Sequence, residues 1–276
     1  MNVSSAPAIN LIESHVFATK LSHPVRAVHC SQRNPCFHPI RSVGRIMNSL
    51  KDLPRRAILL GVADDDKPVL LDLNESDPGS ILVYCDQGYG KTHQLQVIVD
   101  SIMKARYCSW MKIEVLSANP WEWEGPSVKN IQRKKCVNVL AWNDPQVEKM
   151  IARLAEIVQQ RIIDQCDSRE IILVLDDVNR MEKLSEQTQV NLNYIFSTGP
   201  KVKVWPVASM SVERRRTFTS DLIDLFDTLI LGHVSNPMRM AGYRCDECLA
   251  SELDPGEFMV NAGGRWNAYR LPMIGA

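Results

Sequence analysis

Short apolar runs alternate with amphipathic segments along most of the chain. The apolar runs predict strands at 81–85, 111–118, 136–142, 171–175, 203–209 and 228–234. Apolar residues at helical spacing predict helices over 91–106, 144–162 and 183–197. Strands that alternate with helices favour βαβ units. The pattern therefore predicts an α/β fold with a mostly parallel sheet flanked by helices.

Two further strand pairs are predicted as β-hairpins at the two ends of this region. AILLGV and VLLDL flank the acidic turn DDDKP, which predicts an N-terminal hairpin over 57–73. GEFMVNAGGRWNAYRLP, at 256–272, predicts a C-terminal hairpin with Gly-Gly at its turn.

The first 56 residues differ from the rest in charge and periodicity. Up to residue 60 there are eight Lys and Arg against two acids, and prolines recur at 7, 24, 35 and 39. We interpret 1–56 as a basic, loosely structured arm with one short helix near 42–51, and 57–276 as the main domain. The arm is open to three roles: a disordered tail, a segment that docks a partner, or a DNA contact.

Composition excludes several classes of protein. The 276 residues are 45% hydrophobic and 23% charged, which excludes a mostly disordered chain. The formal net charge is zero, so binding to nucleic acid through bulk charge is not expected, although a local basic face is allowed. No apolar stretch reaches 18 residues, so no membrane segment is expected. The N-terminus lacks a secretory signal and the eight cysteines are too few for a disulfide scaffold, which predicts a cytoplasmic protein.

The segment CDQGYGKT (85–92) lies between a predicted strand and a predicted helix. Gly90, Lys91 and Thr92 match the end of the phosphate-loop pattern G-x-x-x-x-G-K-[ST]. Cys85 stands where the pattern has its first glycine, which places a side chain where the turn usually has none. The loop predicts phosphate binding by backbone N–H groups and by the N-terminus of the helix.

The expected nucleotide-binding residues are those of the loop and of the helix start. Within this set, Lys91 is expected to reach the β- and γ-phosphates of ATP, and the hydroxyl of Thr92 to ligate Mg²⁺. The set is Asp86, Gln87, Gly88, Tyr89, Gly90, Lys91, Thr92 and His93.

A second acidic motif follows about 85 residues later, in IILVLDDV (171–178). Asp176 is expected to hold the hydration shell of Mg²⁺, and Asp177 stands where many ATPases have a glutamate that polarises the attacking water. Aspartate is one methylene shorter, which sets its carboxylate back by about 1.5 Å. The alternative is that the acidic pair caps the next helix. In combination, the two motifs predict a P-loop NTPase with a RecA-like sheet, with Lys91, Asp176 and Asp177 as catalytic residues.

The run ILLGVADDDKPVLLDLNESDPGSILVYCDQGYGKT resembles the start of the FtsK/SpoIIIE/HerA motor domain. The similarity continues through WNDPQVEKMIARLAEIVQQR (142–161), IILVLDDV, VWPVASM (204–210) and GEFMV with the late Arg270, over roughly 57–272. The resemblance implies an ATPase that forms a homo-oligomeric ring, usually a hexamer, and pumps double-stranded DNA through its pore.

The chain departs from this family at several positions. Cys85 replaces glycine, Asp177 replaces glutamate, and Ser209-Met210 replaces the Thr-Gln of the sensor strand. Ser209 is then the candidate sensor, and an arginine finger that acts between subunits is expected from Arg180 or from the triplet Arg214, Arg215 and Arg216. These departures leave two alternatives: a degenerate nucleotide-binding subunit with a scaffold or regulatory role, and a secretion or conjugation coupling ATPase.

Three other groups of residues allow more than one interpretation. Cys245 and Cys248, and separately His29, Cys30, Cys36 and His38, are candidate zinc ligands or free thiols. Trp121, Trp123 and Trp142 either stack on bases or belong to the core or an interface. Arg133, Lys134 and Lys135 form a solvated face or line a pore.

Overall fold

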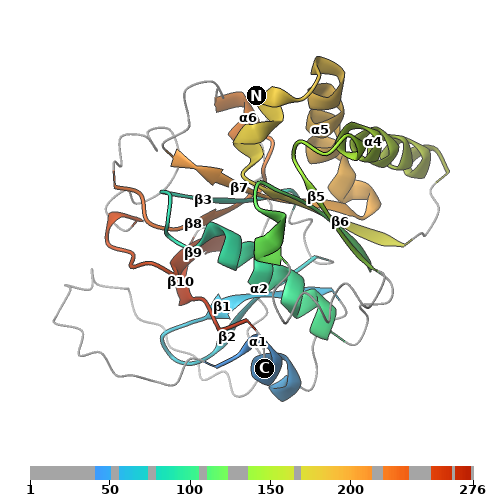
Figure 1. The fold of residues 1–276 in the computed structure, drawn as a ribbon. Coiled ribbons are helices and arrows are strands. Elements are labelled where there is room, and N and C mark those ends of the chain that lie inside the picture. The colour runs from blue at the N-terminus through green and yellow to red at the C-terminus, as the bar shows by residue number, and fades with distance from the viewer. Residues whose placement is uncertain are drawn as a thin grey trace, which may run out of the picture.

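The computed structural model describes residues 41–50, 56–73, 79–105, 111–123, 136–164, 169–212, 220–235, 250–262 and 265–274. Within these residues ten strands form one sheet, in the order β2-β1-β10-β9-β8-β3-β7-β6-β4-β5 (Figure 1). The strands are β1 (Ala57–Val62), β2 (Pro68–Asp72), β3 (Ile81–Cys85), β4 (Met111–Ser117), β5 (Val137–Ala141), β6 (Glu170–Asp176), β7 (Val204–Ser211), β8 (Thr228–Leu231), β9 (Glu257–Ala262) and β10 (Arg265–Arg270).

The six strands from β8 to β5 are parallel, as the alternation of strands and helices predicts. β7 lies between β3 and β6 and pairs with both in parallel register, with Val83 opposite Ser209 and Leu175 opposite Ala208. The strand that carries the phosphate-loop motif and the strand that carries the acidic motif are therefore separated by one strand.

Helices cover both faces of the sheet (Figure 1). α2 lies on one face, and α4 and α5 lie on the other. The helices are α1 (Val43–Ser49), α2 (Lys91–Lys104), α4 (Gln146–Asp164), α5 (Glu186–Thr198) and α6 (Ser220–Ile223), with 3₁₀ turns η2 (Pro120–Trp123), η3 (Val178–Lys183) and η4 (Gly199–Val202).

The central strands are apolar throughout because both of their faces are buried. In β3, Val83 and Cys85 join the core cluster under α1 and α2, whereas Leu82 and Tyr84 join the cluster under α4 and α5. Successive side chains of a strand point to opposite faces, so a strand covered on both sides contains no polar alternation.

Both predicted hairpins are present, and they belong to the same sheet. β1 pairs with β2, and β9 pairs with β10, each antiparallel. β10 also pairs with β1, with Val62 opposite Arg270, and β9 pairs with β8, with Ile230 opposite Val260. The two ends of the domain thus meet at one side of the parallel sheet.

The helix expected near 42–51 is present as α1. Val43 and Ile46 are buried, and the side chain of Ser42 caps the helix by accepting from the N–H of Arg45. The N–H of Val43 donates to the carbonyl of Met273 at 2.9 Å, which ties α1 to the C-terminal segment. Residues 41–50 therefore pack against the domain, and residues 1–40 of the arm lie outside the described residues.

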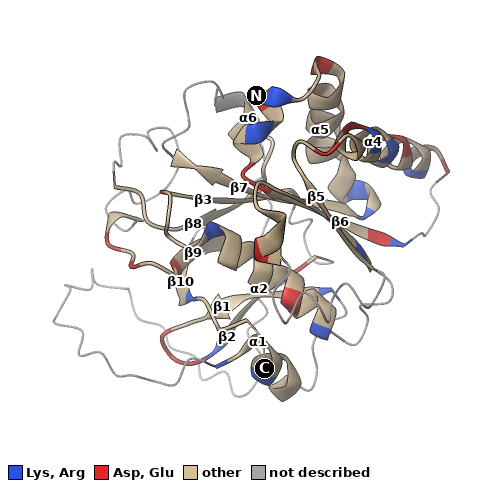
Figure 2. Ribbon diagram, viewed as in Figure 1, with Lys and Arg blue, Asp and Glu red and all other residues tan. Residues whose placement is uncertain are grey.

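α4 shows how its sequence sets its boundaries and its buried face. The N–H of Gln146 donates to Oδ1 of Asp144 at 2.8 Å, which confirms Asp144 as the N-terminal cap. Val147, Ile151 and Leu154 are buried, and Lys, Arg, Asp and Glu alternate along the outer face (Figure 2). No helix in the described part of the chain is both long enough and apolar enough to cross a bilayer.

Candidate active site

The loop from Asp86 to Gly90 joins the end of β3 to the start of α2, where the sequence places the phosphate loop. Gly88 and Gly90 have φ angles of 87° and 99°, a left-handed conformation that glycine adopts without steric cost. Gly90 is the cap of α2 and supplies no side chain to the first-turn N–H groups. These N–H groups and the positive end of the helix dipole form a site for an anion such as phosphate.

Cys85 is accommodated without the cost expected from its side chain. Among the described non-glycine residues, only Asp66, Asp177 and Lys203 have positive φ, so the backbone of Cys85 does not need a glycine. Its side chain packs against Gly232, where an added Cβ would lie 2.8 Å from the Cβ of Cys85. Burial raises the pKa of the Cys85 thiol to about 12, so the thiol is neutral at physiological pH.

The ammonium group of Lys91 lies within the loop. Its Nζ donates to the carbonyl oxygen of Asp86 at 2.8 Å and to that of Cys85 at 3.2 Å. The positive charge of Lys91 thus lies against the backbone of the loop, where it is suited to stabilise phosphate oxygens.

Two side chains of the loop are bound to the segment that follows β8. The buried carboxylate of Asp86 accepts from the N–H of Ser235 at 2.7 Å and from its hydroxyl. The ring of Tyr89 stacks on the ring of His233, with centroids 4.2 Å apart and planes 5° apart. Asp86 and Tyr89 therefore shape the loop through their side chains, and the N–H of Asp86 is itself donated to the carbonyl oxygen of His233 at 2.8 Å.

His93 and Gln87 complete the set of residues that the sequence assigns to the nucleotide. Nε2 of His93 lies 3.0 Å from the carbonyl oxygen of Pro272, and burial lowers the pKa of His93. The imidazole is consequently favoured as neutral and contributes no positive charge beside the loop. Gln87 is exposed at the tip of the loop.

The carboxylate of Asp176 lies at the centre of the site. It is 7% exposed and sits at the end of β6. Burial raises its pKa, and four hydrogen bonds act in the opposite direction. The four donors are Thr92 Oγ1 at 3.1 and 3.2 Å, Ser117 Oγ at 3.0 Å, Ser209 Oγ at 3.2 Å and Trp123 Nε1 at 3.4 Å.

The donor atoms around Asp176 fit a magnesium ion bound together with a nucleotide. Mg²⁺ prefers hard oxygen ligands and is usually held by one or two carboxylates, waters and substrate phosphates. The hydroxyl of Thr92 and the carboxylate of Asp176 are adjacent oxygen ligands of this kind. The described residues contain no group of three or more His, Cys, Asp or Glu side chains that could hold a metal by themselves.

Asp177 is held by the 3₁₀ turn that follows it. Its φ is 69°, its Oδ1 accepts from Nδ2 of Asn179 at 2.9 Å, and its Oδ2 lies 3.8 Å from Nε of Arg180. Its N–H donates to Oγ of Ser209 at 2.8 Å, so Ser209 contacts both acidic residues. Asp177 occupies the N-cap position of η3, but its side chain makes no capping hydrogen bond there.

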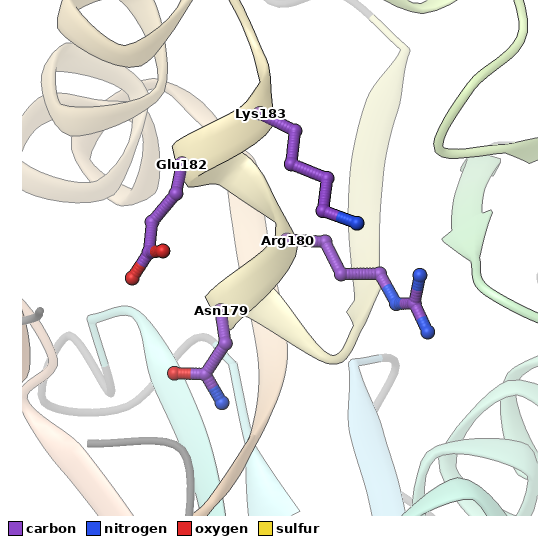
Figure 3. Close-up of a pocket in the computed structure, with 4 residues that line it drawn as sticks. All are labelled: Asn179, Arg180, Glu182 and Lys183. Carbon is purple, nitrogen blue, oxygen red and sulfur yellow. The ribbon is translucent and has the colours of Figure 1, made fainter. Parts of the chain in front are cut away.

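A pocket of about 350 Å³ lies beside η3. Its lining residues are Asn179, Arg180, Glu182 and Lys183. The side chains of Asn179 and Glu182 extend from one side of the turn, and those of Arg180 and Lys183 extend from the other (Figure 3). Residues three apart align on the same side of a 3₁₀ helix, which explains this separation. Because Asn179 and Arg180 both contact Asp177, the pocket adjoins the acidic end of β6.

Of the three tryptophans considered as stacking or core residues, two are buried and one is exposed. Trp123 and Trp142 are buried, which confirms their placement in the core. Trp123 donates to the carboxylate of Asp176, and Trp142 donates to the backbone carbonyl of Asp176 at 2.9 Å. Trp121 is 65% exposed. Neither Ser117 nor Trp123 belongs to a motif that predicts contact with Asp176. The pairing of β4 with β6 indicates the contact of Ser117, and no sequence signal indicates that of Trp123.

Several other candidates lie outside the described residues. These are Arg214, Arg215 and Arg216, both sets of candidate zinc ligands, and Arg133, Lys134 and Lys135.

Comparison with solved structures identifies ATPases with the same fold. The cytoplasmic domain of the Thermomonospora curvata type VII secretion ATPase EccC superposes with a TM-score of 0.63 at 16% identity, over 79% of this chain and 28% of that one. The pCW3 conjugation coupling protein TcpA, solved with ATPγS, gives 0.62 at 13%, over 79% of this chain and 66% of that one. The genome packaging NTPase B204 of Sulfolobus turreted icosahedral virus 2, also with ATPγS, gives 0.51 at 11%, over 71% and 99%.

These similarities establish the fold. The chain has the P-loop NTPase fold, its structural neighbours are FtsK/SpoIIIE-type ATPases at low sequence identity, and it spans 28% of the length of EccC. No family model matches the sequence, and no curated protein matches it.

Proposed function

We propose that this chain is an ATP-binding and ATP-hydrolysing motor domain of the FtsK/HerA type. The observation that carries the proposal is the contact between Thr92 and Asp176, which are 84 residues apart in sequence and 3.1 Å apart in space. The two motifs expected for nucleotide and for metal thus converge on one point at the carboxyl ends of the parallel strands. Ligands of open α/β sheets bind at this edge.

The roles of the residues follow from their positions. The N–H groups from Gly88 to Thr92 hold the phosphates, and Lys91 neutralises the β- and γ-phosphate oxygens. Thr92 and Asp176 would hold Mg²⁺, directly and through its water shell. When bound there, Mg²⁺ would neutralise charge that develops on the phosphoryl oxygens.

Hydrolysis also needs an oriented water molecule. Asp177 is proposed to accept a proton from that water, and Ser209 to link Asp177 with Asp176, because it contacts both residues. Arg180 lies against Asp177 of its own chain. We therefore assign the arginine that acts between subunits to Arg214 or Arg215.

The proposed assembly is a homo-oligomeric ring, hexameric by family resemblance, that acts on double-stranded DNA in the cytoplasm. The similarity in fold to a conjugation coupling protein and to a genome packaging NTPase supports a nucleic-acid substrate. Contacts would be with phosphates and therefore independent of sequence.

A second candidate is a motor that moves protein. EccC is a type VII secretion ATPase, and a further structure with the same fold contains EccC in complex with a signal sequence peptide. DNA binding that weakens steeply with salt would favour the DNA motor, since phosphate contacts release counterions. Absence of such binding would favour the protein motor.

The proposal is tested by ATP turnover of the purified chain, with and without double-stranded DNA. We expect turnover that DNA stimulates and that Lys91→Ala abolishes. Lys104→Ala is the matched control, because Lys104 lies at the other end of α2 and pairs with Asp100. Nucleotide binding without turnover would support the degenerate subunit instead. No nucleotide binding would overturn the proposal.

A further inference from the structure

The segment 117–123, which runs from the last residue of β4 to the end of η2, contacts the proposed metal site, although it belongs to neither sequence motif. Ser117 is the last residue of β4 and lies directly opposite Asp176 in the parallel pairing of β4 with β6. Its hydroxyl donates to Oδ2 of Asp176 at 3.0 Å and is fully buried. The register of two central strands therefore fixes this contact.

Trp123 approaches the same carboxylate oxygen from η2. Its Nε1 lies 3.4 Å from Oδ2 of Asp176, and its side chain is 0% exposed. A buried indole has few alternative positions, so its N–H is a fixed donor. Ser117 and Trp123 both donate to Oδ2 and Ser209 donates to Oδ1, while Thr92 is within hydrogen-bond distance of both oxygens.

The segment is itself held in place at several points. The N–H of Asn119 donates to Oγ of Ser117 at 3.1 Å, and Nδ2 of Asn119 donates to Glu122 at 2.9 Å. Nε2 of Gln96, on α2, donates to the carbonyl of Glu122 at 2.8 Å. The helix that begins at the phosphate loop is thus bonded to the segment that positions the acidic residue.

We propose that Ser117 and Trp123 are positioning residues that hold the carboxylate of Asp176 in the orientation in which it takes the Mg²⁺ of bound nucleotide. The inference rests on the proposed nucleotide site. Without these two donors Oδ2 keeps only the bond from Thr92 Oγ1 at 3.2 Å, so the carboxylate is held less firmly in the orientation that would take Mg²⁺. Partners of metal ligands commonly change metal affinity by about 10–100-fold when they are removed.

The experiment measures the Mg²⁺ dependence of nucleotide binding, separately from turnover. A fluorescent ATP analogue, the N-methylanthraniloyl derivative, is bound to the full chain at increasing MgCl₂, and again in EDTA. For Ser117→Ala we expect the Mg²⁺ concentration at half-saturation to rise about tenfold. For Trp123→Phe we expect about threefold, since its bond is longer. Affinity in EDTA should stay within about twofold for both variants, because neither residue contacts the phosphate loop.

Two matched variants separate positioning from packing. Ser101→Ala removes another buried hydroxyl, which bonds to Leu59 and Ile98 away from the site, and Trp205→Phe trims another buried indole. Both should leave the Mg²⁺ dependence unchanged. Ser117→Thr keeps the hydroxyl, so its Mg²⁺ concentration at half-saturation should be within about twofold of the wild-type value.

The outcomes distinguish this inference from the proposed function. If the wild-type chain binds the analogue in a Mg²⁺-dependent manner but Ser117→Ala and Trp123→Phe show the wild-type Mg²⁺ dependence, the positioning role is wrong and the nucleotide site stands. An equal loss of affinity with Mg²⁺ and in EDTA also overturns it, since that indicates general damage. If the wild-type chain does not bind the analogue at all, the proposed function fails first.

Discussion

The buried carboxylate of Asp176 opposes folding at neutral pH. Burial raises its pKa, so the folded state binds this proton more tightly than the unfolded state. The stabilising contribution of the protonated group is complete at low pH and is lost as the pH rises through the pKa of the folded state. Above that pKa, the protein carries a charge whose desolvation reduces the free energy of unfolding.

We therefore expect Asp176→Asn to raise the free energy of unfolding at pH 7 by about 1 kcal/mol, while it abolishes Mg²⁺-dependent nucleotide binding. Urea unfolding at a series of pH values measures this. The difference in the free energy of unfolding between Asp176→Asn and the wild type should shrink as the pH falls toward the ordinary range of carboxyl titration, because Asp176 is then protonated in the wild type. A gap that is independent of pH, or a variant less stable at pH 7, would contradict the account.

Asp177 differs from Asp176 in its exposure and in its role. Its side chain is 17% exposed and is held by Asn179 and Arg180 rather than by the strands. We expect Asp177→Asn to reduce turnover by about 100-fold with nucleotide binding unchanged, since the amide cannot accept the proton of the attacking water. Steady-state turnover beside equilibrium binding checks this.

Asp177→Glu provides the complementary change. It moves the carboxylate outward by about 1.5 Å, to the reach of the residue that related ATPases use, and we expect turnover to rise several-fold if the shorter side chain is what limits it. Glu182→Gln, on the exposed side of the same turn, is the control. Unchanged turnover in Asp177→Asn would exclude the water-positioning role.

At the scale of elements, the contact between the two hairpins depends on Gly61. The pairing of β1 with β2 shifts register between Leu59 and Gly61. A Cβ at Gly61 would lie 2.2 Å from Cδ2 of Tyr269 and 2.6 Å from the carbonyl oxygen of Arg270. The N-terminal and C-terminal hairpins can therefore pair only because this position has no side chain.

We expect Gly61→Ala to lower the free energy of unfolding by about 3 kcal/mol, because the added methyl group forces β1 away from β10. Gly88→Ala is the comparison, since its Cβ would meet nothing within 4 Å and only the positive φ opposes it. That variant should cost about 1 kcal/mol. Chemical denaturation of both variants measures the difference, and equal losses would show that the close approach of β1 and β10 is unimportant.

Local patterns predict the elements well because each is encoded within a few residues. The strand at 81–85, the cap at Asp144 and both hairpins are all found at their expected places. The packing of α1 against the C-terminal segment, and the contact of Ser117 with Asp176, were not predictable. They depend on pairings between residues more than 50 positions apart, and no local pattern specifies which strands become neighbours.

At the scale of the whole molecule, the order of the strands assembles the site. β3 supplies the loop, β6 the acidic pair and β4 Ser117, and β7 places Ser209 in the space between β3 and β6. Because these strands are parallel, their carboxyl ends lie at one edge, and residues far apart in sequence meet there. At this edge the guanidinium of Arg180 lies 3.8 Å from the carboxylate of Asp177 in the same chain.

A ring that shares its active sites between subunits makes a specific prediction for mixtures of inactive variants. Lys91→Ala removes the loop lysine but keeps the proposed arginine finger, whereas a chain with both Arg214→Ala and Arg215→Ala keeps the loop and lacks the finger. In a mixed ring, the loop of the second variant meets the finger of the first. We expect an equimolar mixture to recover roughly a quarter of wild-type turnover, since that fraction of random interfaces pairs the two intact parts.

Arg180→Ala provides the control in the same experiment. Its guanidinium contacts Asp177 of its own chain, so adding Lys91→Ala should not raise turnover above that of the Arg180→Ala chain by itself. Recovery in that mixture would instead identify Arg180 as the residue that acts between subunits, and would show that its contact with Asp177 breaks when the ring forms. If neither mixture recovers turnover although the wild-type chain is active, each chain hydrolyses ATP with its own residues, and the shared ring site is wrong.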